Sequence, residues 1–234
     1  MKKLRITLML IGAMCFLAIA KVSAQDETAG EESSSPFSVG VDVVSDYVWR
    51  GTELSGPSFQ PSLKFTKGNF TAGVWGSFNF IGTYGEADPY LSYTAPFGLT
   101  IGMTDYYLTS TDFFNVSDTA GAHGFEINAG YSAKGFSINA NYILNEAPAL
   151  GTMGGDIYVQ LGYAYKNFNV FLGGGNGWHT LNDDNGDDKF NICNIGLGAT
   201  KEIKVSDSFT IPVFGQVILN PDTKQFFVVI GLSF

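Results

Sequence analysis

Charged residues and cysteine are both scarce in this chain, and their scarcity excludes several classes of protein. Only 15% of its 234 residues are Lys, Arg, Asp or Glu, against about a quarter in soluble domains. The mean hydropathy of +0.10 is too high for a disordered chain and too low for a bundle of membrane helices. The two cysteines, Cys15 and Cys193, give no disulfide framework, and no Cys–His spacing typical of zinc sites is present.

Basic residues are the scarcer of the two charge signs. The chain has 13 Lys and Arg against 22 Asp and Glu, for a formal charge of −9. Residues 1–24 hold four of the basic residues and no acidic one, so residues 25–234 carry 9 basic against 22 acidic residues, or −13. Nucleic-acid binding needs a basic face, and this balance excludes it as a partner class.

The N-terminal residues have the pattern of a secretory signal peptide. Three basic residues precede an apolar run at Leu8–Ala20, and small residues at 22–24 offer a cleavage site before Gln25. The alternative is a membrane-anchoring helix, but the run is short and Lys21 follows it. We therefore expect residues 1–24 to be removed on export, which would leave one cysteine.

The remaining chain divides into an acidic leader and one β domain. Residues 25–35 are polar and acidic, which predicts a disordered periplasmic tail. Residues 36–234 show no sustained helical period. They show instead apolar residues at every second position, in segments separated by Gly, Pro, Asn and Asp. We predict twelve strands, at 37–49, 59–65, 70–80, 91–94, 99–104, 125–132, 136–142, 157–163, 168–173, 193–200, 209–217 and 226–234.

The two faces of these strands predict an antiparallel, up-and-down transmembrane β-barrel. In the first strand Phe37, Tyr47 and Trp49 share the apolar face, and the opposite face is largely polar. Aromatic residues at the ends of an apolar face are typical of two membrane interfaces. An even number of strands places both termini on one side, as in bacterial outer-membrane barrels.

The connections between the strands alternate in length, as they do in such barrels. Short turns alternate with longer segments at 50–58, 81–87, 109–122, 145–155 and 176–189. The connections 201–208 and 220–224 fit less well, which leaves the count open by one hairpin. The alternative is a water-soluble sandwich or lipocalin-like barrel. The polar faces oppose it, because they are rich in Asn, Gln, Ser, Thr and Gly rather than Lys and Glu.

Two short segments resemble a known family. Residues 45–51 read Ser-Asp-Tyr-Val-Trp-Arg-Gly, and residues 73–77 read Gly-Val-Trp-Gly-Ser. They resemble an uncharacterised family of bacterial outer-membrane proteins that has a Ser-Asp-Tyr-x-x-Arg-Gly motif, and the similarity covers about residues 40–95. This chain has Thr52-Glu53-Leu54 where that pattern expects a Ser-rich stretch. The resemblance implies an outer-membrane barrel, often suspected to be a porin, and implies no substrate.

Several charged residues fall on the inward-facing parity. On the lipid face a Lys or Arg would cost about 2–4 kcal/mol near the midplane. Inside the barrel such charges either brace the wall as ion pairs or select solutes at a constriction, and Arg50 has Asp46 and Glu53 as nearby candidate partners. The predicted lumen charges are Asp42, Asp46, Arg50, Lys64 and Glu126.

Bulky aromatic residues also fall on the inward parity. They either line a path for an apolar solute or fill the space, since a barrel of this size is narrower than a general porin. The loop 109–122 is a further candidate to fold into the lumen. The predicted lumen aromatics are Trp75, Tyr90, Tyr106, Tyr158, Phe171, Phe214 and Phe227.

Metal binding and catalysis have only weak candidates. The acidic loop holds Asp183, Asp184, Asp187 and Asp188, but it lacks the EF-hand spacing, so we predict a solvated loop and no metal or cofactor. An acyl-chain hydrolase would need a Ser–His pair. Ser110 or Ser117 with His123 is the available combination, and nothing else favours it, so we expect no enzyme.

These observations lead to a ranked expectation of function. First is a narrow, porin-like passive channel for small polar solutes in the outer membrane of a Gram-negative bacterium. Second is a non-conducting barrel that supports the envelope. The expected partners are outer-membrane lipid, lipopolysaccharide and, during biogenesis, the barrel-assembly machinery, whose signal the terminal Phe234 resembles.

Overall fold

The computed structural model describes residues 35–117, 121–181, 189–207 and 209–234. The predicted signal peptide, nearly all of the predicted leader and the four aspartates of the acidic loop lie outside these residues. The described chain is all-β apart from one 3₁₀ turn, η1 (Gly177–His179). None of its helices is long and apolar enough to cross a membrane.

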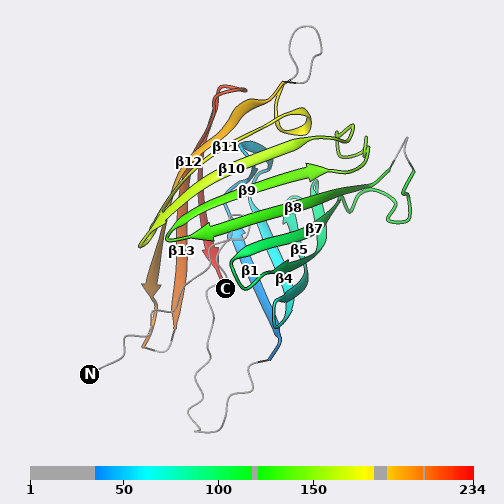
Figure 1. The fold of residues 1–234 in the computed structure, drawn as a ribbon. Coiled ribbons are helices and arrows are strands. Elements are labelled where there is room, and N and C mark those ends of the chain that lie inside the picture. The colour runs from blue at the N-terminus through cyan, green and yellow to red at the C-terminus, as the bar shows by residue number, and fades with distance from the viewer. Residues whose placement is uncertain (1–34, 118–120, 182–188, 208) are drawn as a thin grey trace.

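Twelve antiparallel strands close into a barrel, which confirms the predicted fold class and strand number. Each strand pairs with its neighbours in the barrel, and β1 closes the barrel against β14 (Figure 1). The strands are β1 (Phe37–Val44), β4 (Ser58–Lys67), β5 (Phe70–Asn79), β6 (Gly85–Thr94), β7 (Leu99–Tyr107), β8 (His123–Ala133), β9 (Phe136–Ile143), β10 (Ile157–Tyr165), β11 (Phe168–Gly175), β12 (Asn191–Lys204), β13 (Thr210–Asn220) and β14 (Gln225–Ser233).

The two ends of the barrel differ in the length of their connections. The turn end carries the tight turns, among them Lys67–Phe70 and Ala133–Phe136, together with Phe37 and Phe234. The loop end carries the longer connections. Several strands run further than the alternation predicts: β6 begins at Gly85, and β12 extends to Lys204. The first half of the long connection predicted at 201–208 is therefore strand.

The first predicted strand is wrong beyond Val44. The chain bends at Ser45 and Asp46 and forms a separate two-stranded sheet from β2 (Tyr47–Trp49) and β3 (Thr52–Ser55). We call this element the inner hairpin (Tyr47–Ser55). Tyr47 and Trp49 are both buried, so neither lies on the outward face that was predicted for them, and 50–58 is not an outer loop.

Side chains on the outer wall are apolar and exposed, whereas those facing the interior are mostly polar. The strand registers place odd-numbered residues of β1 outward and even-numbered residues inward, and the other strands follow from their pairing. Outward residues with large exposed apolar side chains include Val39, Leu63, Val74, Leu91, Ile101, Ile127, Ile138, Leu161, Val170, Leu197, Val217 and Val228.

Candidate functional site

The inner hairpin turns back through two residues with left-handed backbones. Arg50 has φ 49° and Gly51 has φ 87°, the pair of positive values that a two-residue type I′ turn requires. Trp49 pairs with Thr52 across this turn. The Arg-Gly of the Ser-Asp-Tyr-x-x-Arg-Gly segment is therefore the tip of a hairpin.

The tip is docked closely against the barrel wall. A Cβ on Gly51 would lie 1.9 Å from the carbonyl oxygen of Cys193 on β12. The Asn220 side chain of β13 donates a hydrogen bond of 3.1 Å to the Gly51 carbonyl. Glycine is thus required at position 51 both for its φ and for the missing side chain.

Arg50 reaches from the tip to Glu126 on β8. Its Nη1 and Nη2 donate to the two carboxylate oxygens at 2.6 and 2.8 Å. Tyr106 Oη and Asn128 Nδ2 also donate to Glu126, at 3.0 and 2.6 Å. The Glu126 side chain is 0% exposed and that of Arg50 is 9% exposed, so this is a bidentate ion pair out of water.

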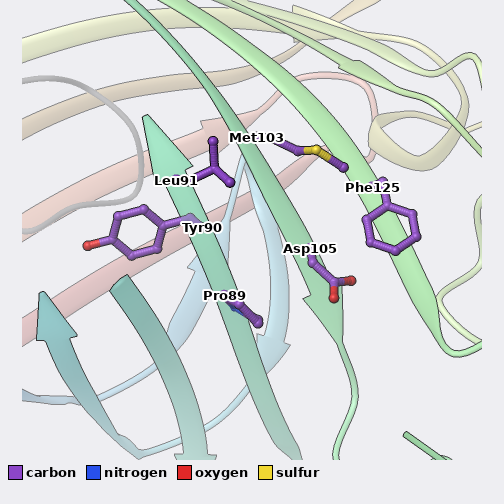
Figure 2. Close-up of a pocket in the computed structure, with 6 residues that line it drawn as sticks. All are labelled: Pro89, Tyr90, Leu91, Met103, Asp105 and Phe125. Atoms are coloured by element: carbon purple, nitrogen blue, oxygen red, sulfur yellow. The ribbon is translucent and has the colours of Figure 1, made fainter. Parts of the chain in front are cut away.

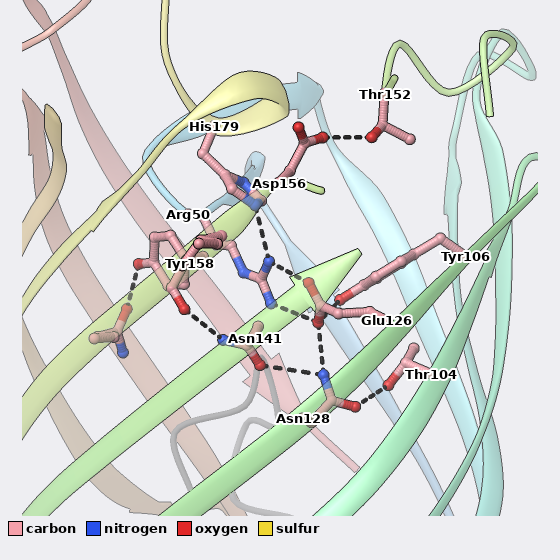
Figure 3. Close-up of polar contacts among 12 residues, drawn as sticks. Arg50, Thr104, Tyr106, Glu126, Asn128, Asn141, Thr152, Asp156, Tyr158 and His179 are labelled. Atoms are coloured by element: carbon pink, nitrogen blue, oxygen red, sulfur yellow. Dashed lines mark hydrogen bonds and ion pairs between the residues drawn. The ribbon is translucent and has the colours of Figure 1, made fainter. Parts of the chain in front are cut away.

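The same guanidinium is held between two aromatic rings and a histidine. Its carbon lies 4.5 Å from the ring centroids of both Trp49 and Tyr158, a cation–π arrangement. Arg50 Nη1 lies 3.3 Å from Nε2 of His179 in η1 (Figure 3). The buried His179 ring lies between Trp49 and Tyr158, with centroids 5.2 Å from each.

The contact with Arg50 fixes the tautomer of His179. A guanidinium only donates hydrogen bonds, so Nε2 must accept and the ring proton is on Nδ1. Within the described part of the chain, that buried Nδ1 has no hydrogen-bond partner. Burial, and then the charge of Arg50, lower the pKa of His179 well below its ordinary value, so the ring is neutral at neutral pH.

A network of side-chain hydrogen bonds on the wall supports these residues. Thr104 Oγ1 donates to the Asn128 carbonyl oxygen at 2.9 Å, and Asn128 Nδ2 donates to Asn141 at 3.1 Å. Further round the barrel, Asn194 Nδ2 donates to Tyr158 Oη at 2.8 Å. The network crosses β7, β8, β9, β10 and β12 and holds the acceptors of the Arg50 tip in fixed positions (Figure 3).

The other face of the inner hairpin packs on aromatic residues. Tyr47 and Trp49 lie with Tyr106 and Ile143 in one buried cluster, against which Leu54, Trp75, Tyr84, Leu150 and Trp178 pack. The ring centroids of Tyr47 and Trp75 are 5.4 Å apart, as are those of Trp49 and Tyr106. The hairpin therefore has an apolar attachment as well as a polar one.

The interior is closed around the inner hairpin. Each of the twelve strands contributes at least one buried inward residue at its middle or in its half toward the loop end. These residues are Val44, Ser58, Ser77, Glu86, Tyr106, Glu126, Asn141, Tyr158, Gly173, Asn194, Ile218 and Val229. Toward the turn end the interior is polar and accessible, at Lys64, Thr71, Ser92, Thr100, Ser132, Ser137 and Thr200.

The wall has an irregular seam between β6 and β7. Their ladder covers Tyr90–Thr94 and stops at Pro89, which has no N–H to donate. The Tyr107 N–H instead donates to the Asp88 carboxylate at 3.3 Å. A shallow hollow of about 200 Å³ lies at this seam on the outer wall, lined by Pro89, Leu91, Met103, Asp105 and Phe125 and bordered by Tyr90, whose ring points away from it (Figure 2).

His123 lies on the outer wall beside this seam. Its Nδ1 is 2.9 Å from an Asp105 carboxylate oxygen, and its Nε2 is 2.6 Å from the Phe113 carbonyl. Tyr107 stacks on its ring, with centroids 5.1 Å apart. The described part of the loop 109–122 thus packs through Phe113 against the outside of the wall, away from the lumen where it was a candidate to fold.

The structure brings together only two of the five predicted lumen charges. Arg50 and Glu126 pair, which replaces Asp46 or Glu53 as the expected partner of Arg50. Asp42 and Lys64 face inward on β1 and β4, and Asp46 lies at the bend before β2, outside the barrel ladder. The predicted inward aromatics do face the interior. Within the described residues, no group of three or more His, Cys, Asp or Glu residues is placed to hold a metal ion.

Sequence reasoning missed two main features of this site. His179 lies in a connection, where alternation says nothing, so its approach to Arg50 had no signal. Trp49 was assigned to the outside by parity. The signal that could have corrected it was Arg50-Gly51 itself, a dipeptide compatible with a hairpin turn at the end of a strand.

Comparison with protein-family models, curated proteins and solved structures finds no match to this chain. The likeness to the Ser-Asp-Tyr-x-x-Arg-Gly family therefore stays a resemblance of short segments.

Proposed function

We propose that this chain is an outer-membrane, porin-like β-barrel whose inner hairpin closes a narrow passage for small polar solutes. The exposed apolar wall supports the membrane location, because a closed barrel satisfies its backbone hydrogen bonds and presents apolar side chains to lipid. On this proposal residues 1–24 direct export, and lipid, lipopolysaccharide and the barrel-assembly machinery are the partners.

The observation that carries the proposal is the polar inner wall that surrounds the inner hairpin. Among the residues that the structure describes, the inner hairpin forms its own two-stranded sheet and shares no ladder with the barrel. The wall around it presents polar side chains, among them Gln60, Ser77, Asn128, Asn141 and Asn194. A water-filled passage needs a polar lining of this kind.

A non-conducting structural barrel is the second candidate. It is favoured by the burial of inward residues on all twelve strands at the level of the hairpin. Neither candidate assigns a reaction to Ser110, Ser117 or His123, and the two ring nitrogens of His123 lie beside Asp105 and Phe113.

Removal of the hairpin separates the two candidates. Deleting residues 47–55 leaves Ser45-Asp46-Gly56-Pro57 between Val44 and Ser58, which already pair in the barrel; four residues suffice for a hairpin loop. In planar bilayers we expect the wild type to conduct in rare or small steps and the deletion variant in larger, lasting ones.

The matched control removes residues 113–116 from the loop on the outer wall, and its conductance should equal that of the wild type. Heat-modifiable migration verifies that each barrel is folded. A folded deletion variant that never conducts would overturn the channel proposal in favour of the structural barrel.

A further inference from the structure

We propose that His179 makes the inner hairpin a proton-operated gate, in which protonation of the imidazole ring releases the Arg50 tip from the wall. This inference rests on the proposed function, because it names the regulation of the same hairpin. It is carried by the contact of Arg50 Nη1 with His179 Nε2 at 3.3 Å.

Protonation removes the one role that His179 plays toward Arg50. Neutral His179 accepts at Nε2, whereas an imidazolium has donors on both nitrogens and cannot accept from a guanidinium. The contact would then join two cations in a site where Arg50 is 9% exposed and the His179 side chain is buried. In so dry a site little water screens their repulsion.

The charged groups around His179 come from three elements. Arg50 of the inner hairpin faces it directly. Glu126 of β8 lies beyond Arg50 and already accepts from Arg50, Tyr106 and Asn128. Asp156, just before β10, accepts from the Thr152 hydroxyl. The neutral rings of Trp49, Tyr158 and Trp178 complete the surroundings. The charged group in contact with His179 is therefore the Arg50 cation.

The sign of the pH dependence follows from linkage. Docking lowers the pKa of His179, by burial first and by Arg50 second, so the released hairpin binds protons more readily than the docked one. The docked hairpin is most stable when the pH is above the ordinary histidine pKa of about 6.5. Below it, the ratio of released to docked hairpin rises up to about tenfold per pH unit, until the pH passes the docked pKa.

The chain supplies its own reporter and its own control. Cys193 is 0% exposed, and its backbone carbonyl lies against Gly51 of the docked tip, so we expect release of the hairpin to expose its side chain. The substitution Cys15→Ser leaves it as the only cysteine in the full chain. His123 is the only other histidine and lies on the outer wall, away from the hairpin.

The experiment measures modification of Cys193 by a small methanethiosulfonate reagent in the folded barrel. Each rate is divided by that of the denatured chain at the same pH, which cancels the intrinsic titration of the thiol. From about pH 7.5 to about pH 5 we expect at least a tenfold rise in the Cys15→Ser background. His123→Gln should keep that rise, whereas His179→Gln and His179→Asn should abolish it.

Bilayer conductance of the same variants keeps the two proposals distinguishable. An unchanged Cys193 rate in acid, while the 47–55 deletion conducts, would overturn the proton gate and leave the channel standing. A rise in Cys193 rate that His179→Gln abolishes, without conductance in any variant, would support the His179 switch and overturn the channel. Loss of the rise in His123→Gln would also contradict the gate, because it would place the titrating group on the outer wall.

Discussion

Arg50 is satisfied by four different side chains, and this explains how a charge is tolerated inside the barrel. Glu126 supplies the counter-charge, the rings of Trp49 and Tyr158 each lie 4.5 Å from the guanidinium carbon, and His179 accepts at its edge. A buried ion pair is stabilising only when its geometry is good and its remaining hydrogen bonds are made. Both conditions hold here.

The coupling of Arg50 and Glu126 is testable by a double-mutant cycle. Arg50→Gln leaves a buried carboxylate unpaired and Glu126→Gln leaves a buried guanidinium unpaired, so each single change should lower the free energy of unfolding by about 3–5 kcal/mol. The double variant should lose clearly less than the sum. Urea unfolding of the barrel in lipid measures all three. Additive losses would show that the pair is not coupled.

Residue parity predicted the direction of side chains well wherever a strand continues. Glu126, Trp75 and Tyr158 face the interior as alternation requires. It did not predict which of these side chains meet, because contact across a barrel depends on register and on connections. The approach of Arg50 to Glu126, 76 residues apart in the chain, is set by where the hairpin folds.

At the level of elements, the inner hairpin shows how alternation misleads at a bend. Phe37, Tyr47 and Trp49 share one parity in the sequence, yet Phe37 is 58% exposed and Trp49 is 5% exposed. The bend at Ser45 and Asp46 turns the chain inward without breaking the apolar-polar period. A period of two shows that a segment is a strand; it does not show which sheet the strand joins.

Docking of the hairpin as a unit should depend on Gly51. In Gly51→Ala the left-handed backbone alone costs about 1–2 kcal/mol, and the methyl group would meet the Cys193 carbonyl. We expect faster Cys193 modification at neutral pH and a lower unfolding free energy. Gly56→Ala is the matched control, because Gly56 has no positive φ and a Cβ there meets nothing within 4 Å. Equal effects from the two changes would refute close docking of the tip.

For the molecule as a whole, the number of strands and their order were predictable, and the state of the lumen was not. Alternating segments and turn residues sufficed to count twelve strands, since each strand is a local signal. Closure of the interior depends on a hairpin that leaves the barrel sheet and on a loop that places His179 inside. Both features depend on contacts between residues far apart in the sequence, and the periodicity of a single sequence does not predict such contacts.

Phe234 extends the pairing of β1 with β14 that closes the barrel. Phe234 exchanges two backbone hydrogen bonds with Val41, of 2.9 and 3.1 Å, and its ring points outward. Deleting Phe234 should therefore lower both the stability of the barrel and the yield of folded, heat-modifiable protein in cells. Phe234→Ala keeps the backbone bonds, so the purified barrel should unfold at nearly the wild-type urea concentration. If the ring is the signal for assembly, that variant should still assemble poorly in cells, and normal assembly would leave barrel closure as the only role of this residue.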